Sequence, residues 1–283
     1  MAARFTLLCG AYAKLAAKRI PAKQVIKPDM LISHFEHGPV SAYPRDYLDG
    51  EHQPLHLHRE AQLLYAVRGI MRVVTDLGAW VIPPSRAVWI PPQVAHEIFM
   101  SGDVQMRSLF IAPERSPASL QQCCVLAVTP LLRELILRAV QGPPHADNPL
   151  IQQLMLEELA GLENLPLHIP MPSDRRLQNI CLALLHTPDH ANTLEDWAQQ
   201  VGASSRTLAR LFQQQVQMSF NAWRQQLRLM EALPRLLAGD SVQRVARDLG
   251  YGSARAFSAM FRRLLGDNPR DYLQTLSKLS ELV

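Results

Sequence analysis

The sequence predicts an α+β protein with two domains, a β-rich N-terminal domain followed by an all-helical C-terminal domain. The length of 283 residues suits about two domains of ordinary size. Between residues 30 and 112, short apolar and β-branched runs alternate with Gly, Pro and Asp, which is typical of a sandwich or a barrel. From residue 174 onward, apolar residues instead recur at helical spacing.

Composition indicates an ordinary globular protein of the cytoplasm. Hydrophobic residues make up 48% of the chain and charged residues 19%. No stretch approaches the roughly 18 consecutive apolar residues of a membrane helix, so we expect no membrane partner. The four cysteines include no C-x-x-C pair, which predicts neither a zinc knuckle nor a disulfide framework and favours a reducing compartment.

The charge of the chain is unevenly distributed. Residues 1–173 hold 15 basic and 15 acidic residues, whereas residues 174–283 hold 14 basic and 10 acidic ones, so the C-terminal domain carries the whole net charge of +4. Residues 1–29 form a predicted basic extension, because six cations precede the first acid, Asp29. Cations follow its short apolar core as well as precede it, which favours a poorly ordered cytosolic extension, or an over-long gene start, over a signal peptide.

The domain boundaries follow from these patterns. A β domain is predicted at 30–115 from the runs "AQLLYAVRG", "IMRVVTD", "AWVIPP" and "AVWIPP". A helical segment at 116–162 contains two amphipathic stretches, 130–140 and 149–162, which we expect to pack on the β domain or on a partner subunit. Residues 163–173 contain three prolines and no periodicity, so they are predicted to be a linker.

The stretch "TLEDWAQQVGASSRTLARLF" predicts a helix, a tight turn and a second helix. Thr193 is a candidate N-cap, with Asp196 three positions later. Gly202 ends the first helix, and Ser204 or Ser205 can cap the next one. Apolar residues at offsets i, i+3, i+4 and i+7 give the first helix one buried face, made of Leu194, Trp197, Ala198 and Val201.

The same pattern recurs 48 residues later. Ser241 is the cap, Gly250 turns the chain and Ser253 caps the second helix. The first helix repeats the four apolar offsets with Val242, Val245, Ala246 and Leu249, and the second buries Phe257, Met260, Phe261 and Leu264. Identical offsets are not expected of a generic helical bundle with solvated arginines. Residues 174–283 are therefore predicted to contain two helix-turn-helix units, at about 193–214 and 241–264.

The side chains outside these apolar faces predict a DNA-binding surface. Arginine and glutamine on a short helix can contact phosphates and read base edges in a major groove. Residues 205–230 contain four arginines, Arg224 and Arg228 among them, and no acid. The predicted DNA-binding residues are Ser205, Arg206, Ala209, Arg210 and Gln213 in the first unit and Arg255, Ser258 and Arg262 in the second.

With these motifs the chain resembles the AraC/XylS family of bacterial transcription regulators over about residues 174–275. The matching stretches are "LEDWAQQVGASSRTLARLFQQ", "SFNAWRQQLRLMEAL" and "SVQRVARDLGYGSARAFSAMFRRLLGDNPRDYL". The resemblance implies that the second helix of each unit enters the major groove, on successive segments of one DNA face. Alanines form no bidentate bond with a base, so the second unit is expected to discriminate less. Matched by position, the base-reading candidates are Arg206, Ala209 and Arg210, then Ala254, Arg255, Ser258 and Ala259.

Pro234 departs from the expected pattern of the helix that joins the two units. Proline removes a backbone donor and clashes with the preceding helical turn. We therefore expect this helix either to kink at Pro234 or to end early, and each outcome would change the spacing of the two base-reading helices.

The stretch "GEHQPLHLHREAQLLYAVRG" resembles the first motif of the cupin barrels, with His56 and His58 at the places of two metal ligands. Gln62 stands where the metal-binding family has glutamate, and His96 stands at the place of the third histidine. Met100 replaces the family's asparagine. Because side chains alternate along a strand, His56 and His58 should share one face and point into a barrel, with His96 opposite them.

The resemblance implies a cupin-like β-barrel (jelly roll) at residues 30–115, used as a sensor domain, and leaves the content of its pocket open. Three neutral imidazoles can hold a divalent metal such as Zn, Ni, Fe or Mn. Gln62 supplies a neutral oxygen in place of a carboxylate, so no cofactor is required. A metal-free pocket for an organic effector, a metal-containing sensor pocket and a purely structural histidine cluster are the alternatives. The effector-binding candidates are His56, His58, Gln62 and His96, and the metal candidates are His56, His58 and His96.

These features predict a ligand-responsive, sequence-specific transcription regulator, a repressor or an activator, and not an enzyme. Family members commonly carry an N-terminal cupin-like effector domain followed by dimerisation helices, and some control a neighbouring transporter or efflux gene. The expected partners are double-stranded DNA, a small-molecule effector, a second copy of the chain and, for an activator, RNA polymerase. The alternatives are a metal-dependent cupin enzyme with a helical appendage and an architectural DNA binder with weak sequence preference.

Overall fold

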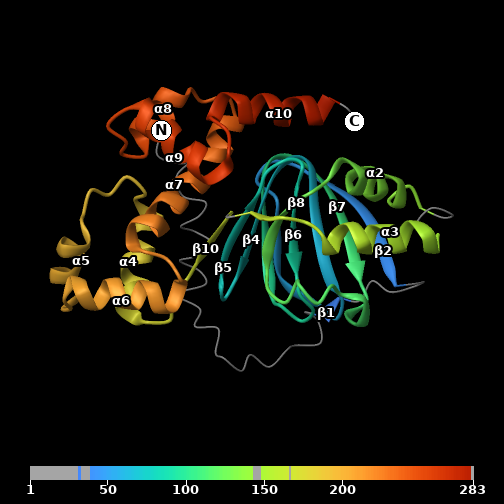
Figure 1. Cartoon of the computed structure of the whole chain (residues 1–283), viewed down its shortest axis with the longest axis horizontal. Coiled ribbons are helices and arrows are strands. Elements are labelled where there is room, and N and C mark those ends of the chain that lie inside the picture. Colours follow the sequence, from blue (N-terminus) through green and yellow to red (C-terminus); the bar gives the residue numbers. More distant parts are fainter. Residues whose placement is uncertain (1–30, 33–38, 143–147, 166, 282–283) are drawn as a thin grey trace. The chain divides into compact units, whose positions relative to one another are not determined.

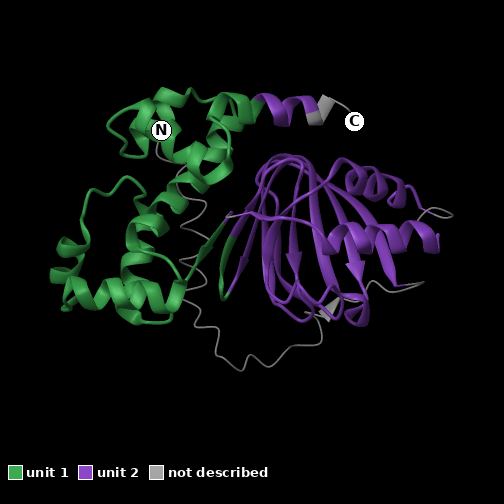
Figure 2. Cartoon of the chain, in the orientation of Figure 1, with its two compact units in different colours: residues 1–24, 76–79, 168–273 green, residues 25–75, 80–167, 274–283 purple. Residues whose placement is uncertain are grey.

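The computed structural model describes residues 31–32, 39–142, 148–165 and 167–281. The predicted basic extension, residues 1–29, lies outside the described residues. The chain forms two compact units, coloured separately in Figure 2: unit 1 includes Asp76–Ala79 and His168–Leu273, and unit 2 includes Trp80–Leu167 and the strands before Asp76. Among the described helices, none is long and apolar enough to cross a membrane.

Unit 2 is built on a rolled sheet (Figure 1). Its longest strands, β4 (Ala61–Thr75) and β7 (His96–Ile111), pair with each other in antiparallel fashion along most of their length. Strands β2 and β3 both pair with β7, β6 pairs with β4, and β8 pairs with β6. The remaining strands are β1 (Leu31–Ile32), β2 (Val40–Tyr47), β3 (His52–His58), β5 (Gly78–Ile82), β6 (Arg86–Ile90), β8 (Cys124–Ala127) and β9 (Asn164–Leu165).

The runs "AQLLYAVRG" and "IMRVVTD", predicted as separate strands, form the single strand β4. Gly69 lies inside it at φ +73°, and the register with β7 shifts on both sides of its neighbour Arg68. A Cβ on Gly69 would come 2.5 Å from the backbone oxygen of Asp103, so only glycine fits here. The glycine therefore marks an irregularity within one long strand and not a turn between two strands.

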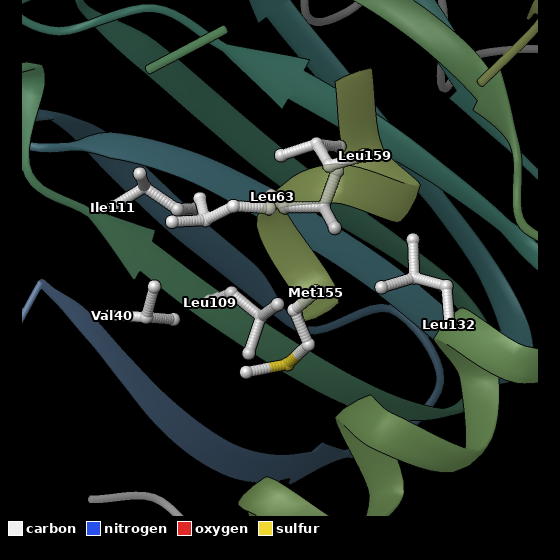
Figure 3. A pocket seen from close by; sticks show the side chains of 8 residues that line it. Val40, Leu63, Leu109, Ile111, Leu132, Met155 and Leu159 are labelled. Carbon is white, nitrogen blue, oxygen red and sulfur yellow. The ribbon is translucent and has the colours of Figure 1, made fainter. Parts of the chain in front are cut away.

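One face of the sheet packs against helices α2 (Pro130–Ala139) and α3 (Pro149–Ala160), which begin at the N-caps Thr129 and Asn148. Apolar side chains from the sheet and both helices meet in a seam that leaves no space for a water molecule (Figure 3). The core of unit 2 lies in this seam, and the polar residues described below lie on the other, inner face of the roll. The seam is lined by Val40, Leu63, Leu109, Ile111, Leu132, Met155, Leu156 and Leu159.

Residues 163–173, predicted to be a linker, contain two short strands. Strand β9 pairs with β8, and β10 (His168–Pro170) pairs with β5. The boundary between the two units falls between Leu167 and His168. Strands of two and three residues are too short to show an alternating pattern, and proline is tolerated at sheet edges, which is why the sequence showed no strand signal.

Unit 1 contains the two predicted helix-turn-helix units. The first consists of α5 (Leu194–Val201) and α6 (Ser205–Val216), and the second consists of α8 (Val242–Asp248) and α9 (Ala254–Leu265). The predicted α+β class, a rolled β domain with helices followed by an all-α domain, is confirmed. The other helices are α4 (Arg175–His186), α7 (Phe220–Leu237), which joins the two helix-turn-helix units, and α10 (Pro269–Glu281), which belongs to unit 1 only as far as Leu273.

The predicted helix caps are confirmed. Thr193 and Asp196 form a capping box at the start of α5. Of the two candidate caps for α6, the structure selects Ser204, whose Oγ accepts the backbone N–H of Thr207 at 3.1 Å. Helices α8 and α9 begin at the side-chain caps Ser241 and Ser253. Left-handed glycines turn the chain after the first helix of each unit, at Gly202 and Gly250.

The joining helix α7 continues through Pro234. It ends three residues later, at Leu237, and the N–H of Ala238 donates to the carbonyl of Pro234 at 2.9 Å. The expected early end is therefore ruled out. Proline has no N–H to offer the carbonyl of Met230, but the buried residues around it, Leu233 and Leu236 among them, keep the last turn helical.

Candidate functional site

The second helix of each helix-turn-helix unit has an apolar inner side and a basic outer side. Leu208 and Phe212 of α6, and Phe257 and Phe261 of α9, are fully buried. Neither helix contains an acidic residue, so the positive charge of each outer side is not neutralised from within the helix. On the outer sides, Arg206, Ala209, Arg210, Gln213, Arg255, Ala259 and Arg262 are exposed, and Ser205, Ala254 and Ser258 are half-buried.

Arg210 is oriented by its own helix. Its Nη1 donates to Oε1 of Gln214, one helical turn further on, at 2.8 Å. The planar guanidinium offers five donors, so the remaining ones can still meet a phosphate or the O6 and N7 atoms of guanine. The α6 surface is thus chemically able to contact DNA through an arginine whose position is already restricted.

Arg224 and Arg228, which the sequence placed in an acid-free basic region, belong to the interior of unit 1. Arg228 has only 8% of its surface exposed, and its Nε donates to the carbonyl of Pro188 at 2.8 Å. Arg224 is half-buried and donates to the carbonyl of Asn192 at 3.0 Å. Both arginines lie on α7 and contact the loop before α5. The prediction that the basic DNA-binding surface includes them is therefore wrong.

Gln215 has a role that the sequence did not reveal. Its Oε1 accepts the backbone N–H groups of Ser173 and Asp174, each at 2.9 Å, at the point where the chain enters α4. On α7, Trp223 and Gln226 donate to the carbonyls of strand β10. A glutamine on a helix gives no local signal of such a distant backbone partner, so this anchoring of α6 and α7 could not be predicted.

The three histidines meet on the inner face of the rolled sheet. His56 of β3 lies directly opposite His96 of β7, and such pairs face the same side. The ring centroids lie 4.3 Å apart for His56 and His96, 4.9 Å for His56 and His58, and 5.4 Å for His58 and His96. All three are buried, and one ring nitrogen from each lies within 4.8 Å of the others.

A bulge in β3 separates these histidines from His52. The register with β7 shifts between Gln53 and His56, so residues before and after the shift face opposite sides. His52 therefore lies on the outer face, where it stacks on Phe99 at 4.4 Å and Nε2 lies 3.0 Å from a carboxylate oxygen of Glu97. Simple alternation would have placed His52 with the other two.

Backbone carbonyls set the tautomers of two of the inner histidines. Nδ1 of His56 lies 2.7 Å from the carbonyl oxygen of Pro54, and Nδ1 of His96 lies 2.9 Å from that of Val94. A carbonyl only accepts, so each Nδ1 carries the proton and each Nε2 keeps a lone pair. Nε2 of His96 is buried and has no hydrogen-bond partner among the described residues.

Burial keeps these imidazoles neutral. It lowers the pKa of His96 to about 3, and the neighbouring His56 adds to this effect. Burial also lowers the pKa of His56. At neutral pH His56 and His96 therefore offer uncharged nitrogen ligands, the form that binds a metal ion or accepts a hydrogen bond.

Gln62 faces the same interior and is connected to the histidine cluster through the neighbouring side chain of Phe110. It lies opposite Phe110 in the β4–β7 pairing, and the Phe110 ring packs edge-on against His58 at 4.9 Å. The Oε1 atom of Gln62 and the Oγ atom of Ser108 are buried and accept no hydrogen bond from the described residues. The inner face thus combines an aromatic ring with several polar atoms that a bound molecule could satisfy.

Comparison with known proteins agrees with these observations. A family model described as a helix-turn-helix domain matches residues 197–275. The HTH-type transcriptional regulator NimR of Escherichia coli (strain K12) is 36% identical over 231 residues, which cover 80% of this chain and 84% of NimR. The arabinose operon regulatory protein of the same organism is 30% identical over 127 residues, covering 44% of this chain and 42% of that protein.

Among solved structures, ToxT from Vibrio cholerae O395 aligns with 84% of this chain and 98% of its own, at 12% identity and a TM-score of 0.37. The relatives and the family model point to one group, and none of the named relatives is an enzyme. With the paired helix-turn-helix units, the acid-free outer sides of α6 and α9 and the similarity to NimR along most of both chains, the chain belongs to the AraC/XylS family of transcription regulators.

Proposed function

We propose that this regulator binds a specific DNA sequence through α6 and α9 and that an effector bound inside the rolled sheet alters this binding. The observation that supports this proposal most directly is that α6 and α9 each have a basic outer side and contain no acidic residue. Purified protein should bind its own upstream intergenic DNA over scrambled DNA of equal length at physiological salt. Equal binding to both sequences would count against sequence-specific reading.

Each of these functions is assigned to one segment of the chain. We assign effector sensing to residues 30–115, subunit contact to the helices within 116–162, the connection to 163–173 and DNA binding to 174–283. Effector binding would change the packing of α2 and α3 and thereby the placement of two DNA-binding domains in a dimer. A ligand shifts such an equilibrium only by its different affinities for the two arrangements.

A divalent cation at His56, His58 and His96 is the proposed occupant of the inner face. The donor set fits: three buried imidazoles converge, and two of them donate Nδ1–H to a backbone carbonyl, the support that metal-binding histidines usually have. The buried lone pair of His96 faces no protein donor among the described residues, so either a metal or a donor group of an organic effector would satisfy it. When bound, a cation would offer the effector an open coordination position.

The cation assignment gives a direct prediction. Wild-type protein should bind one Co²⁺ or Zn²⁺ per chain, and His96→Ala should weaken that binding by more than roughly 100-fold, since second-shell losses alone cost about 10–100-fold. Isothermal titration calorimetry measures the affinity, and the visible absorption of Co²⁺ reports histidine coordination independently of DNA binding.

His52→Ala provides the matched control, because His52 lies on the same strand but on the outer face. It should leave Co²⁺ affinity and spectrum unchanged. An equal loss in both variants, or no Co²⁺ binding by wild-type protein, would contradict the cation site and leave an organic donor group as the occupant.

We further propose that the chain is a homodimer and that α2 and α3 form its interface. Large apolar side chains stay exposed on these two helices, with 47% of the surface exposed for Leu131, 76% for Leu150 and 38% for Leu154. Arg138 and Glu157 are exposed on the same helices. A two-fold interface would bury the leucines and place opposite charges of the two copies within reach of each other.

The double substitution Leu150→Glu and Leu154→Glu is expected to raise the dimer dissociation constant by at least about 100-fold, because burying a leucine contributes roughly 1.5–3 kcal/mol. Sedimentation velocity over a range of concentrations measures this change. The control is Leu48→Glu, which replaces a leucine of unit 2 that is 70% exposed. A dimer unaffected by the double substitution would place the interface elsewhere.

The wider setting follows from these assignments. A cytoplasmic location suits a regulator that must reach the chromosome, and RNA polymerase becomes a partner if the protein activates transcription. Control of a neighbouring transporter, efflux or metabolic gene is the proposed output. A repeated sequence in the intergenic region, protected by the protein in a footprint, would support this output, and an unprotected region would contradict it.

A further inference from the structure

Helix α7 carries a buried cation, Arg228, which has 8% of its surface exposed. Its partners among the described residues are uncharged, a backbone carbonyl and a tyrosine ring. A buried charge is costly unless its environment compensates for it. The partners of Arg228 therefore indicate why a charged side chain is accommodated there.

One of those partners lies in the loop before the first helix-turn-helix unit, and the other lies within the second unit. The Nε of Arg228 donates to the carbonyl of Pro188 at 2.8 Å, in the loop that leads into α5. The guanidinium lies over the ring of Tyr251, 5.3 Å from its centroid, in the turn between α8 and α9. One side chain thus contacts the loop before the first helix-turn-helix unit and the turn within the second one.

The loop and the turn also contact each other at this point. Gly250 has φ +73°, and a Cβ there would come 3.0 Å from the carbonyl oxygen of Asp189 and 3.3 Å from Nη2 of Arg228. The turn of the second helix-turn-helix unit therefore packs closely on the loop that leads into α5, and its positive φ favours glycine. Arg224, one turn earlier on α7, strengthens the connection by donating to Asn192.

From this contact, aromatic rings continue into both units. Tyr251 packs edge-on against Phe257 of α9, with centroids 5.4 Å apart. His190, in the loop, packs against Trp197 of α5 at 5.0 Å. A change at Arg228 would thus reach α9 through Tyr251 and Phe257, and the first unit through the loop and Trp197.

We propose that Arg228 is a positioning residue that sets the separation and rotation of α6 and α9 and thereby determines the spacing of the two DNA boxes that the protein accepts. Arg228 does not itself contact DNA. Its guanidinium combines a directed N–H donor with a flat face for stacking, and the site uses both. The proposal rests on the proposed DNA reading by α6 and α9.

Spacing preference is the property that tests this role. Duplexes selected from a randomised library by the wild-type protein would provide the two boxes, and one base pair would then be inserted between them. One inserted base pair moves the second box by about 3.4 Å and rotates it by about 34°. Wild-type affinity should fall by about tenfold or more, the size of a mismatched base pair. Arg228→Met should bind both duplexes with similar affinity.

Tyr251 supplies the matched pair of variants. Tyr251→Phe keeps the ring under Arg228 and should keep the wild-type spacing preference, whereas Tyr251→Leu should relax it. Should Arg228→Met fail to fold, as judged by circular dichroism, the Tyr251 pair decides the question. Affinity for each isolated box, measured in the same assay, reports on base reading separately from spacing. A wild-type protein indifferent to the insertion, or Tyr251→Leu or a folded Arg228→Met as sensitive to it as wild type, overturns the proposal.

Discussion

The double variant Arg206→Ala and Arg210→Ala is expected to lower operator affinity by roughly 30-fold to 20,000-fold at physiological salt, because each bidentate arginine contact to a base contributes about 1–3 kcal/mol. Both side chains are exposed on the acid-free outer side of α6. Fluorescence anisotropy with a labelled operator duplex measures the change.

The salt dependence separates the two kinds of contact that these arginines can make. An arginine that contacts a phosphate releases counterions, so its removal should flatten the slope of log affinity against log salt by about one. An arginine that reads a base should instead relax specificity at one operator position. Arg175→Ala, an exposed arginine on α4, is the control and should change neither property. Operator affinity and specificity unchanged in the double variant would show that α6 does not read DNA.

Truncation of the core beneath α9 is expected to have the largest effect on stability. Phe257 is fully buried, with Tyr251 and Phe261 at ring distances of 5.4 and 5.9 Å, and Phe257→Ala should cost about 3–5 kcal/mol. That is a large part of the roughly 5–15 kcal/mol that stabilises an ordinary domain. The second helix-turn-helix unit should therefore open locally while unit 2 stays folded.

Hydrogen exchange resolved by peptide measures this opening directly. Amides of α8 and α9 should exchange faster in Phe257→Ala, while those of β4 and β7 should keep their wild-type rates. The control, Leu264→Ala, truncates a half-buried residue of the same helix and should have a smaller effect. Uniform acceleration across both units would contradict independent stability of the DNA-binding part.

Features that depend on neighbouring residues could be predicted from the sequence. The capping box of Thr193, the turn at Gly202 and the repeat 48 residues later each involve interactions within a few positions, so their signals are local. The convergence of His56, His58 and His96 could also be anticipated, although only through the resemblance to a barrel motif. The structure brings these rings together.

Features that depend on distant pairing could not be predicted. The burial of Arg228 depends on Pro188, which lies 40 positions away, and nothing in the helical pattern distinguishes it from a solvated arginine. The continuity of β4 through Gly69 depends on how closely Asp103 approaches. In both cases a correct local pattern was overridden by a tertiary contact.

The bulge in β3 decides how many imidazoles face the interior. If the ladder ran regularly onward from the pairing of His56 with His96, His52 would lie opposite Met100 and face inward. The interior would then hold a fourth imidazole with no change in the sequence. A one-residue slip of the first half of this strand against β7 would thus alter the set of inner nitrogen donors without any mutation.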